Sequence, residues 1–405
     1  GFNGHRHLPE ALIVYLKSIG CNVRILIPGD SQQLSATVPN GTTMEKVDAS
    51  LISSQMVFHD ALRVHLLVQH RQSSDPLYGR LVQTVGNGSA PSLGTHALHQ
   101  PGKGQLAVAL PLITHVYHTL DDSTVEASMR RALEWLFGRV DEHGLPNQFG
   151  RLCTDNVRRR TGEVAAAYAN GVKRRVVICA TNHQKDVWNE LIHQLRVEDR
   201  DRLGGDNTGR AYKSVDCAAS VGDDNGEHEL AEQSIAENSN LYQHLDASVP
   251  KSILQLQIGD VVMLAKTICS RSGLVKNEIY TIAELRTYTV VVQNFAEVLH
   301  TIPRTRFVIN VNAAGNIKIA RKQFPFHHAW AITVHKSQGA TLERSLLDLC
   351  SVYWEHGQGY VAIGRTQRAV DTGAFVNDNC SVSRDGGGPP VPIMAVVCLQ
   401  SLLAR

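Results

Sequence analysis

The sequence lacks the features that mark several large classes of protein. Its 405 residues contain no run of the ~20 apolar residues needed to cross a bilayer, so we expect no membrane-spanning segment. The best candidate, residues 391–404, is too short and contains Pro392, which favours a core strand or helix. The eight cysteines form no C-x-x-C pair, which argues against a zinc ribbon or a redox motif. Scattered cysteines instead favour free thiols in a reducing compartment.

A strong charge of either sign is also missing. The formal net charge is only +2, which does not mark a nucleic-acid-binding protein. It does not exclude one either, because a groove can be basic while the total charge is balanced. Hydrophobic residues make up 43% and charged residues 19%, as in ordinary soluble proteins, and the length predicts two or three domains.

The hydrophobic pattern near the start predicts an α/β unit. Apolar residues recur at helical spacing over 8–19, and Gly20 can end that helix. The apolar run 23–27 predicts a buried strand, followed by a turn at 28–30. Ligands of open α/β sheets bind at the carboxyl ends of strands, so this turn is a candidate site.

A second α/β unit is expected near Val176. A short strand over 176–179 precedes an amphipathic helix over 186–195, and a separate helix is predicted over 124–137. The segment 204–250 is polar and acidic, which predicts a loop or partial disorder.

From Leu254 onward the hydrophobic period changes to two, which predicts a small barrel-like β domain. Its β-rich segments are DVVMLA (260–265), IYTIAEL (279–285) and TVVVQNF (289–295). The α/β pattern returns near Ala329, and the tail from Ser381 is typical of a linker followed by an apolar segment.

Three short islands carry residue types suited to phosphate chemistry. The first is GDSQQL (29–34), in which Gln33 follows an acidic turn. A glutamine amide both donates and accepts hydrogen bonds, so it could orient an attacking water or contact a terminal phosphate oxygen. Taken alone, a turn in which Asp30 caps main-chain amides is the simpler interpretation.

The second island is AWAITVHKSQGAT (329–341), where an apolar strand runs directly into a polar segment. The polar residues are Thr333, His335, Lys336, Ser337 and Gln338, followed by Gly339. Hydroxyls, a lysine and exposed amides suit phosphate oxygens, and glycine permits close approach of the backbone. A solvated loop with a helix cap is the alternative, which the density of phosphate-type donors disfavours.

The third island is HGQGYVAIGRTQR (356–368). Arg365 follows an apolar strand or helix and could reach a γ-phosphate as an arginine finger. A lone arginine in such a place is more often an ordinary surface residue, so this hypothesis depends on the other islands.

Together, the order and spacing of the islands resemble the Pif-type (petite integration frequency) ATP-dependent DNA helicases of superfamily one, which include the helicase part of Helitron transposons. The resemblance covers roughly residues 5–371. It is carried by HRHLPEAL (5–12), GDSQQL (29–34), the segment 48–72 ending near Arg71, YKSVD (212–216), QIGDVVMLAK (257–266), GLVKN (273–277), IPRTRF (302–307), RKQFPFHHAWAITVHKSQGATLE (321–343) and HGQGYVAIGR (356–365).

The resemblance implies a nucleotide site made by residues far apart in the sequence. Gln33 would sense the γ-phosphate, with Arg71 and Arg365 flanking it and stabilising charge that develops during hydrolysis. Gln33 and Arg365 are thus the candidate catalytic residues, and Gly339 would lie near the nucleotide.

The resemblance also implies contacts to single-stranded DNA. The candidate residues are Thr333, His335, Lys336 and Ser337. They would hold the strand through its phosphates or couple it to ATP, without regard to base sequence. We therefore expect an ATP-dependent 5′-to-3′ DNA helicase acting in DNA repair, recombination or telomere maintenance. ATP and Mg²⁺ would be its cofactors, and it would act as a monomer in the nucleus or mitochondrion, without membrane contact.

The fold implied is α/β, with RecA-like P-loop NTPase helicase lobes (a parallel sheet flanked by helices) and a small β-rich SH3-like insert. The expected parts are the end of the first RecA-like domain with motifs III and IV (1–73), the first part of the second with irregular loops (74–250), the SH3-like insert (251–325), the second part of the second with motifs V and VI (326–380) and a divergent tail (381–405).

A phosphate-cradling G-x-x-x-x-G-K-[ST] loop is not visible in the sequence. PGKGQ (101–105) has Gly104 where a hydroxyl is needed for magnesium and lacks a glycine five positions before Gly102. Because HRHLPEAL resembles the segment just after motif II, we expect the P-loop and the acidic magnesium ligands upstream of Gly1. The chain would then be a fragment of a longer protein and inactive by itself.

Other interpretations stay open. The chain could be a non-catalytic remnant of a Helitron-type helicase that binds single-stranded DNA, or a P-loop enzyme such as an exonuclease subunit of the RecD kind. His327 and His328 beside His335 suggest a metal, but no carboxylate or cysteine spacing supports one, so no metal ligand is expected in this chain.

Overall fold

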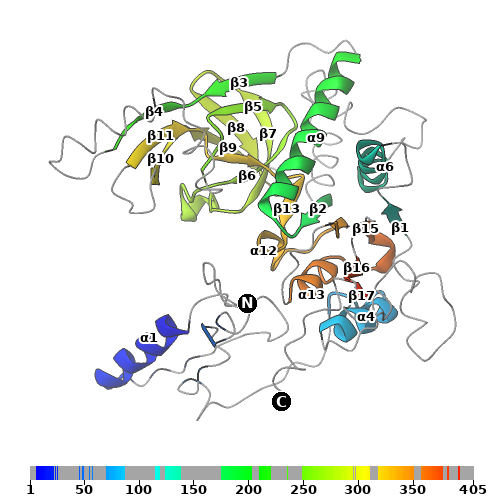
Figure 1. Cartoon of the computed structure of the whole chain (residues 1–405). Coiled ribbons are helices and arrows are strands. Elements are labelled where there is room, and N and C mark those ends of the chain that lie inside the picture. Colours follow the sequence, from blue (N-terminus) through cyan, green and yellow to red (C-terminus); the bar gives the residue numbers. More distant parts are fainter. Residues whose placement is uncertain are drawn as a thin grey trace. The chain divides into compact units, whose positions relative to one another are not determined.

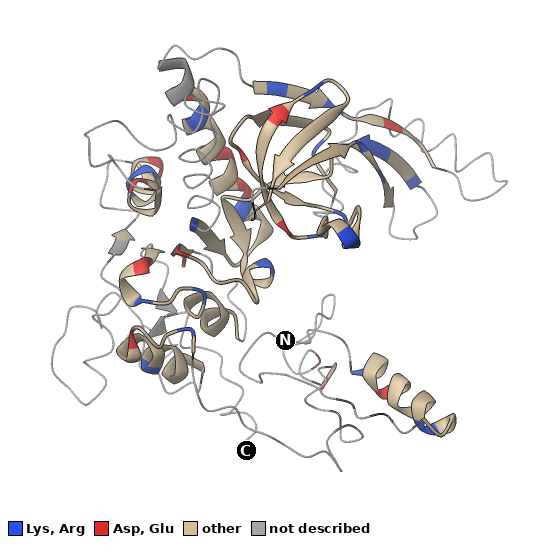
Figure 2. Cartoon of the chain, turned by 180° about the vertical axis from the view of Figure 1, so that it is seen from behind, with Lys and Arg blue, Asp and Glu red and all other residues tan. Residues whose placement is uncertain are grey.

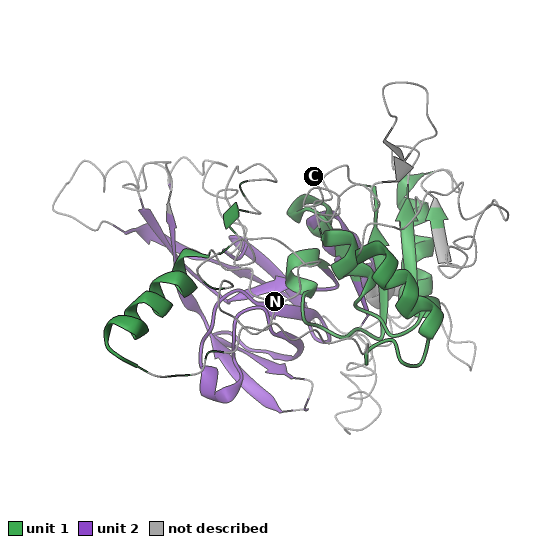
Figure 3. Ribbon diagram, turned by 90° about the horizontal axis from the view of Figure 1, so that it is seen from below, with its two compact units in different colours: residues 1–136, 177–185, 332–405 green, residues 137–176, 186–331 purple. Residues whose placement is uncertain are grey.

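The computed structural model describes residues 6–21, 23, 25, 45, 48–49, 54, 57, 70–86, 115–118, 124–137, 175–202, 209–219, 235, 249–294, 296, 298–310, 318–350, 357–376, 381–382 and 391–392. The chain divides into two compact units (Figure 3). Unit 1 comprises Gly1–Leu136, Val177–Lys185 and Ile332–Arg405, and unit 2 comprises Phe137–Val176 and Asp186–Ala331. Lys and Arg are interspersed with Asp and Glu in both units (Figure 2), in keeping with the net charge of +2.

The α/β part is built on a five-stranded sheet with strand order β1-β15-β14-β2-β13 (Figure 1). Its strands are β1 (His115–His118), β2 (Arg175–Cys179), β13 (Ala331–Thr333), β14 (Arg344–Asp348) and β15 (Thr372–Val376). Strand β15 pairs in parallel with both β1 and β14. Strands β2, β13, β14 and β15 are buried almost throughout, as expected for a parallel sheet covered on both faces. The predicted α/β class is confirmed.

The helices of this part agree with the predictions only in part: those expected over 8–19 and 124–137 lie within one residue of their predicted bounds, the one expected over 186–195 extends further at both ends, and three more described helices were not predicted. They are α1 (His7–Ser18), α4 (Pro76–Gly86), α6 (Val125–Phe137), α9 (Asn182–Arg202), α12 (Val334–Ser337) and α13 (Gln358–Ile363). After α1, Gly20 takes a φ of 66°, the left-handed conformation of a helix stop. At the start of α6 the Thr124 hydroxyl accepts a hydrogen bond from the Ala127 amide at 3.1 Å.

One glycine sets the contact between α6 and the sheet. A Cβ at Gly373 in β15 would lie 2.5 Å from the Trp135 ring, so only glycine lets this ring lie on the strand. Arg344 of β14 lies over the same ring, with its guanidinium 5.2 Å from the ring centroid and Nη1 donating to the Trp135 carbonyl at 2.7 Å.

The β-rich part belongs to unit 2 and contains three antiparallel sheets, ordered β12-β6-β7-β8-β9, β10-β11-β4 and β3-β5. The strands are β3 (Gly209–Lys213), β4 (Val215–Ala218), β5 (Ile253–Gln257), β6 (Val261–Leu264), β7 (Ile279–Leu285), β8 (Thr289–Gln293), β9 (Leu299–Pro303), β10 (Thr305–Asn310), β11 (Lys318–Gln323) and β12 (Phe326–His328). The predicted change to a period of two is confirmed, and the inward side chains form one core around Tyr212, Tyr280 and Phe324.

The loop predicted over 204–250 is wrong for residues 209–218, which form β3 and β4. These are short strands with one solvated face: Tyr212 is buried, while Arg210 and Lys213 are exposed. Charged side chains on the outer face give the segment a polar composition. The few inward-facing positions are too isolated to produce an alternating hydrophobic pattern.

The buried strand predicted over 23–27 is also wrong at its two described positions. Val23 and Ile25 are exposed and lie outside any strand. A buried strand needs neighbours for its main-chain groups, and none of the described strands pairs with this segment. The island GDSQQL, with Gln33, lies outside the described residues.

Candidate functional site

The candidate site begins where the segment after Arg71 docks on the end of α13. Arg71 donates a hydrogen bond from Nη1 to the Gly364 carbonyl at 2.8 Å. Next to it, Gln72 donates from Nε2 to the Thr366 carbonyl at 3.0 Å. These contacts join residues nearly three hundred positions apart, and they place Arg71 against the peptide that precedes Arg365.

The same docking continues into α4 through Asp75. Its Oδ1 accepts a hydrogen bond from the Tyr78 amide at 3.1 Å and so caps the helix. Its Oδ2 accepts one from the Ala369 amide at 3.1 Å. One carboxylate therefore satisfies the start of α4 and the chain that follows Arg365.

Tyr78 anchors the centre of this contact and is fully buried. Its hydroxyl donates to the Ile363 carbonyl at 2.6 Å and lies 2.7 Å from the Thr372 hydroxyl and 3.1 Å from that of Thr366. Because its single hydrogen goes to Ile363, the Tyr78 hydroxyl can only accept from the threonines, whose own hydroxyls also lie 2.5 Å from each other. Burial raises the pKa of Tyr78 to about 12, although the hydrogen bonds from Thr366 and Thr372 act against this.

Arg365 lies inside the protein, with 4% of its surface exposed. Its Nε donates to the Val361 carbonyl at 2.6 Å, within α13. Its Nη1 lies 3.4 Å from the carbonyls of both Ser337 and Ala340, which belong to the second island. The Arg365 carbonyl also accepts the Leu342 amide at 2.9 Å. Arg365 is therefore the physical connection between the second and third islands.

The second island folds as β13, the single-turn helix α12 and a turn at Gly339. Gly339 has a φ of 86° and is exposed, and a Cβ there would meet nothing within 4 Å. It is therefore the backbone conformation, and not a close neighbour, that requires glycine here. Arg365 thus contacts the two residues that lie on either side of the Gln338–Gly339 turn.

The side chains of the four predicted DNA-contact residues differ in their exposure to solvent. His335 is exposed and Lys336 half-buried, so both side chains can reach a ligand in solvent. Thr333 and Ser337 are buried, and the Ser337 hydroxyl donates to the Val334 carbonyl at 2.8 Å. In this conformation Thr333 and Ser337 shape the turn, while His335 and Lys336 face outward.

The structure thus brings Arg71, the Gly339 turn and Arg365 together in unit 1. The predicted roles of these residues, and of Gln33, stay predictions. Sequence reasoning missed the supporting residues Gln72, Asp75 and Tyr78. No local pattern could reveal them, because each acts through a partner at 363–372.

Asn189 of α9 holds the strand that leads into the second island. Its Nδ2 donates to the Ala331 carbonyl at 2.9 Å, and its Oδ1 accepts the Ala331 amide at 2.9 Å. The side-chain amide thereby makes the pair of main-chain hydrogen bonds at Ala331 that a neighbouring strand would otherwise make. The adjacent Trp330 is fully buried, which is common for an aromatic residue beside an apolar strand.

The YKSVD element serves the β-rich part. Asp216 pairs with Arg321 of β11 through two hydrogen bonds, Nε to Oδ1 at 3.0 Å and Nη2 to Oδ2 at 2.8 Å. Arg321 also donates from Nη1 to the Pro250 carbonyl at 3.1 Å, and both charged side chains are at least nine-tenths buried. This element therefore fastens β4 to β11.

No family model matches the chain. Among the helices that the structure describes, none combines the length and apolarity needed to cross a bilayer.

Comparison with curated proteins finds helicases over a limited segment. The chain is 35% identical over 139 residues to the ATP-dependent DNA helicase PIF1 of Danio rerio, a match that covers 31% of this chain and 20% of the relative. It is 34% identical over 142 residues to the PIF1 helicase of Homo sapiens, covering 32% of this chain and 20% of the relative. The matches thus span about a fifth of the length of these relatives.

Among solved structures, a Pif1 helicase from Bacteroides in complex with ADP-AlF3 and ssDNA aligns with 95% of this chain and 66% of that one. The TM-score is 0.51 at 15% identity, so this likeness shows the fold alone. It assigns the parallel sheet and its helices to the RecA-like type. Sequence shared with the PIF1 proteins, on a chain that folds as a Pif1 helicase does, makes this protein a partial homologue of the Pif1-family ATP-dependent DNA helicases.

Proposed function

We propose that this chain is part of the motor of an ATP-dependent 5′-to-3′ DNA helicase, which couples ATP hydrolysis to movement along single-stranded DNA. The observation that carries the proposal is the pair of contacts from Arg365 Nη1 to the carbonyls of Ser337 and Ala340. They link a candidate nucleotide-sensing arginine to a turn whose exposed side chains suit DNA phosphates. The homology to Pif1 helicases supports this assignment.

On the nucleotide side, the guanidinium group of Arg71 is bound to the main chain directly before Arg365. Arg71 is bound to the Gly364 carbonyl, and Arg365 is the next residue. A guanidinium keeps its charge at any physiological pH and can hydrogen-bond to phosphate oxygens in a fixed plane. Arg71 and Arg365 would oppose the negative charge that develops on a γ-phosphate, with Gln33 placed to orient the attacking water.

ATP would supply the free energy by hydrolysis, with Mg²⁺ bound to its phosphates. In the part of the chain that the structure describes, the one cluster of three His, Cys, Asp or Glu side chains is His193, Asp260 and His328 of unit 2. The described residues around Arg365 thus provide cations but no carboxylate cluster for magnesium.

On the DNA side, the second island offers His335, which is exposed, and Lys336, which is half-buried. Their donors would take phosphate oxygens without reading bases, as a translocating motor requires. Thr333 and Ser337 would act indirectly, by holding the turn in shape.

Coupling would follow from the limited hydrogen-bonding capacity of Arg365. A rotation of its guanidinium toward a phosphate would loosen the Nη1 contacts to the 337–340 turn. A change at the nucleotide would therefore shift the turn that carries Lys336, and a shift of the turn would move Arg365. Such a motor would work as a monomer in nuclear or mitochondrial repair, recombination or telomere maintenance.

The proposal is tested by measuring ATP hydrolysis by the full-length protein with and without single-stranded oligothymidine. We expect hydrolysis to rise with DNA, and Arg365→Ala to lower the turnover rate by about 1,000-fold or more while oligothymidine binding persists. The matched control is Arg368→Ala, which removes an exposed arginine that pairs with Asp371 three residues away.

Three outcomes would contradict the proposal. Retained ATP turnover in Arg365→Ala would show that Arg365 is not an arginine finger. Hydrolysis that does not respond to DNA would favour a single-stranded-DNA-binding remnant. Copurification with a nuclease would favour an exonuclease subunit.

A further inference from the structure

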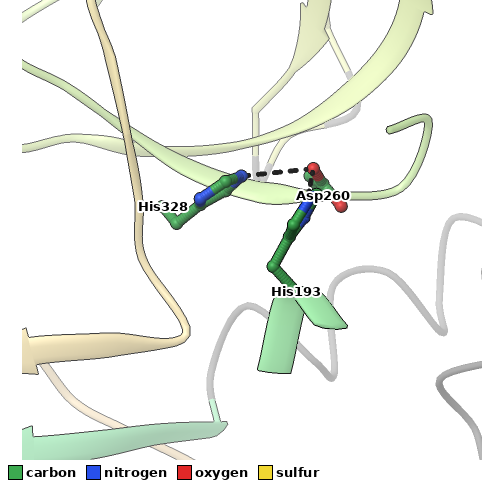
Figure 4. Close-up of side chains that lie close together, drawn as sticks. All are labelled: His193, Asp260 and His328. Atoms are coloured by element: carbon green, nitrogen blue, oxygen red, sulfur yellow. Dashed lines mark hydrogen bonds and ion pairs between the residues drawn. The ribbon is translucent and has the colours of Figure 1, made fainter. Parts of the chain in front are cut away.

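Three metal-ligand side chains meet in unit 2 (Figure 4). His193 comes from α9, Asp260 from the turn between β5 and β6, and His328 from the end of β12. His328 Nε2 lies 3.3 Å and His193 Nδ1 lies 3.9 Å from Asp260 Oδ2, and all three ligand atoms lie within 4.8 Å of one another. The two rings stack at 5.0 Å and 26°, with a nitrogen of each directed at the carboxylate.

These separations approach those of a tetrahedral zinc site. With bonds of roughly 2.0–2.2 Å to imidazole nitrogen and carboxylate oxygen, two ligand atoms lie about 3.3–3.5 Å apart. The His328–Asp260 distance already has this value, and the His193–Asp260 distance exceeds it by about half an ångström. The three ligand atoms are spread over up to 4.8 Å, so the side chains would have to rotate toward one another around a bound ion.

A second observation comes from the imidazole of His193. Its residue is 6% exposed, and Nδ1 finds no hydrogen-bond partner among the described residues. A buried polar atom without a partner costs free energy, which a bound ion would recover.

The strongest argument against a bound metal ion is Arg196, because it already places a positive charge beside Asp260. Its Nε donates to Asp260 Oδ1 at 3.0 Å. It occupies the carboxylate oxygen opposite the histidines and leaves Oδ2 directed at them. Oδ2 also accepts the Gln257 amide at 2.8 Å, which fixes the carboxylate in place. Hydrogen bonds of this kind orient ligating carboxylates in metal sites, so Arg196 and Gln257 fit the role of supporting partners.

We propose that His193, Asp260 and His328 bind one zinc-type divalent ion, with water in the fourth position. Two imidazoles and one carboxylate suit this class of metal better than Mg²⁺ or Ca²⁺, which prefer all-oxygen sites. The ion would tie α9, the β5–β6 turn and β12 together just before the chain enters β13. The inference does not depend on the helicase proposal.

The experiment uses the purified full-length protein, stripped with a chelator and titrated with Co²⁺ as a spectroscopic substitute for Zn²⁺. We expect one Co²⁺ per chain with the visible absorption of a tetrahedral site, displacement by Zn²⁺, and a rise in Tm when Zn²⁺ is added. His193→Ala and His328→Leu should each weaken binding by about 100-fold or more. His327→Leu and His335→Ala, which remove histidines outside the cluster, should bind as the original chain does.

No stoichiometric binding, or equal binding by His328→Leu, would overturn the proposal. In that case the cluster is the buried Arg196–Asp260 ion pair packed against two histidines. If the histidine variants do not fold, X-ray absorption of the Zn²⁺-loaded original chain decides. Two nitrogen ligands of imidazole type support the site, and an all-oxygen shell rejects it.

Discussion

Arg71 Nη1 donates a hydrogen bond of 2.8 Å to the carbonyl of Gly364, the residue that precedes Arg365. Tyr78, in the following helix α4, donates a hydrogen bond to the carbonyl of Ile363, the residue before Gly364. The end of α13 is therefore held by side chains from the 71–78 segment. Stability and function of this region should depend on the same few contacts.

Arg71→Ala should destabilise unit 1 by roughly 1–3 kcal/mol, because it removes a charge-assisted hydrogen bond to a partly buried carbonyl. Urea unfolding followed by circular dichroism measures this. Arg80→Ala is the matched control, since Arg80 is an exposed arginine on the neighbouring α4. Equal stability of Arg71→Ala and Arg80→Ala would mean that the Arg71–Gly364 contact contributes nothing.

Tyr78 should make stability fall in alkaline solution. Its pKa rises from 10.0 to about 12 on folding, so the unfolded chain loses this proton first. The contribution is complete below pH ~10 and declines as pH rises toward 12, by roughly 2–3 kcal/mol at ~1.4 kcal/mol per pKa unit.

Tyr78→Phe should remove that part of the decline and also lower stability at neutral pH, because the Ile363 carbonyl loses its donor. Urea unfolding at a series of pH values separates the two effects. Tyr288→Phe, which removes a tyrosine that is 82% exposed, should follow the original chain at every pH. A Tyr78→Phe curve parallel to the original between pH 10 and 12 would show that burial does not shift the Tyr78 hydroxyl.

Sequence patterns predict the elements that are locally periodic and miss those defined by distant partners. The helix over 124–137 and the strand over 176–179 are confirmed because their apolar spacing repeats within one element. Strand β3 was hidden because only Tyr212 points into the core while its neighbours are charged or small. Propensity scales describe an average environment, and an edge strand departs from it.

The candidate site divides in the same way. Arg365 and Gly339 stand in islands with a distinctive local composition, so the sequence identifies them as candidates. The cluster of His193, Asp260 and His328 has no such signal, because its members are 67 and 68 residues apart and come from three elements. Only the fold brings them together. In the sequence His328 stands next to His327, whereas in the structure it lies beside His193 and Asp260.

Lys336 should contribute to single-stranded DNA binding through a phosphate. Lys336→Ala should weaken binding of oligothymidine and reduce the slope of log K against log salt by about 0.7, the value for one phosphate contact on a single strand. Fluorescence anisotropy at several salt concentrations measures both quantities. Lys322→Ala removes an exposed lysine of β11 and is the control for general loss of positive charge. An unchanged salt slope in Lys336→Ala would place the DNA elsewhere.

Asp216 and Arg321 should be among the most sensitive positions of the β-rich part. Asp216→Asn leaves a buried guanidinium without its counter-charge, and breaking a buried pair in this way costs about 3–5 kcal/mol. Glu190→Gln breaks the Lys251–Glu190 pair, whose side chains are both 66% exposed, and should change stability by less than about 1 kcal/mol. Replacing both Asp216 and Arg321 by apolar residues of similar size should restore part of the loss, because no charge is then buried alone. If Asp216→Asn and Glu190→Gln unfold at the same urea concentration as the original chain, the YKSVD element does not fasten β4 to β11.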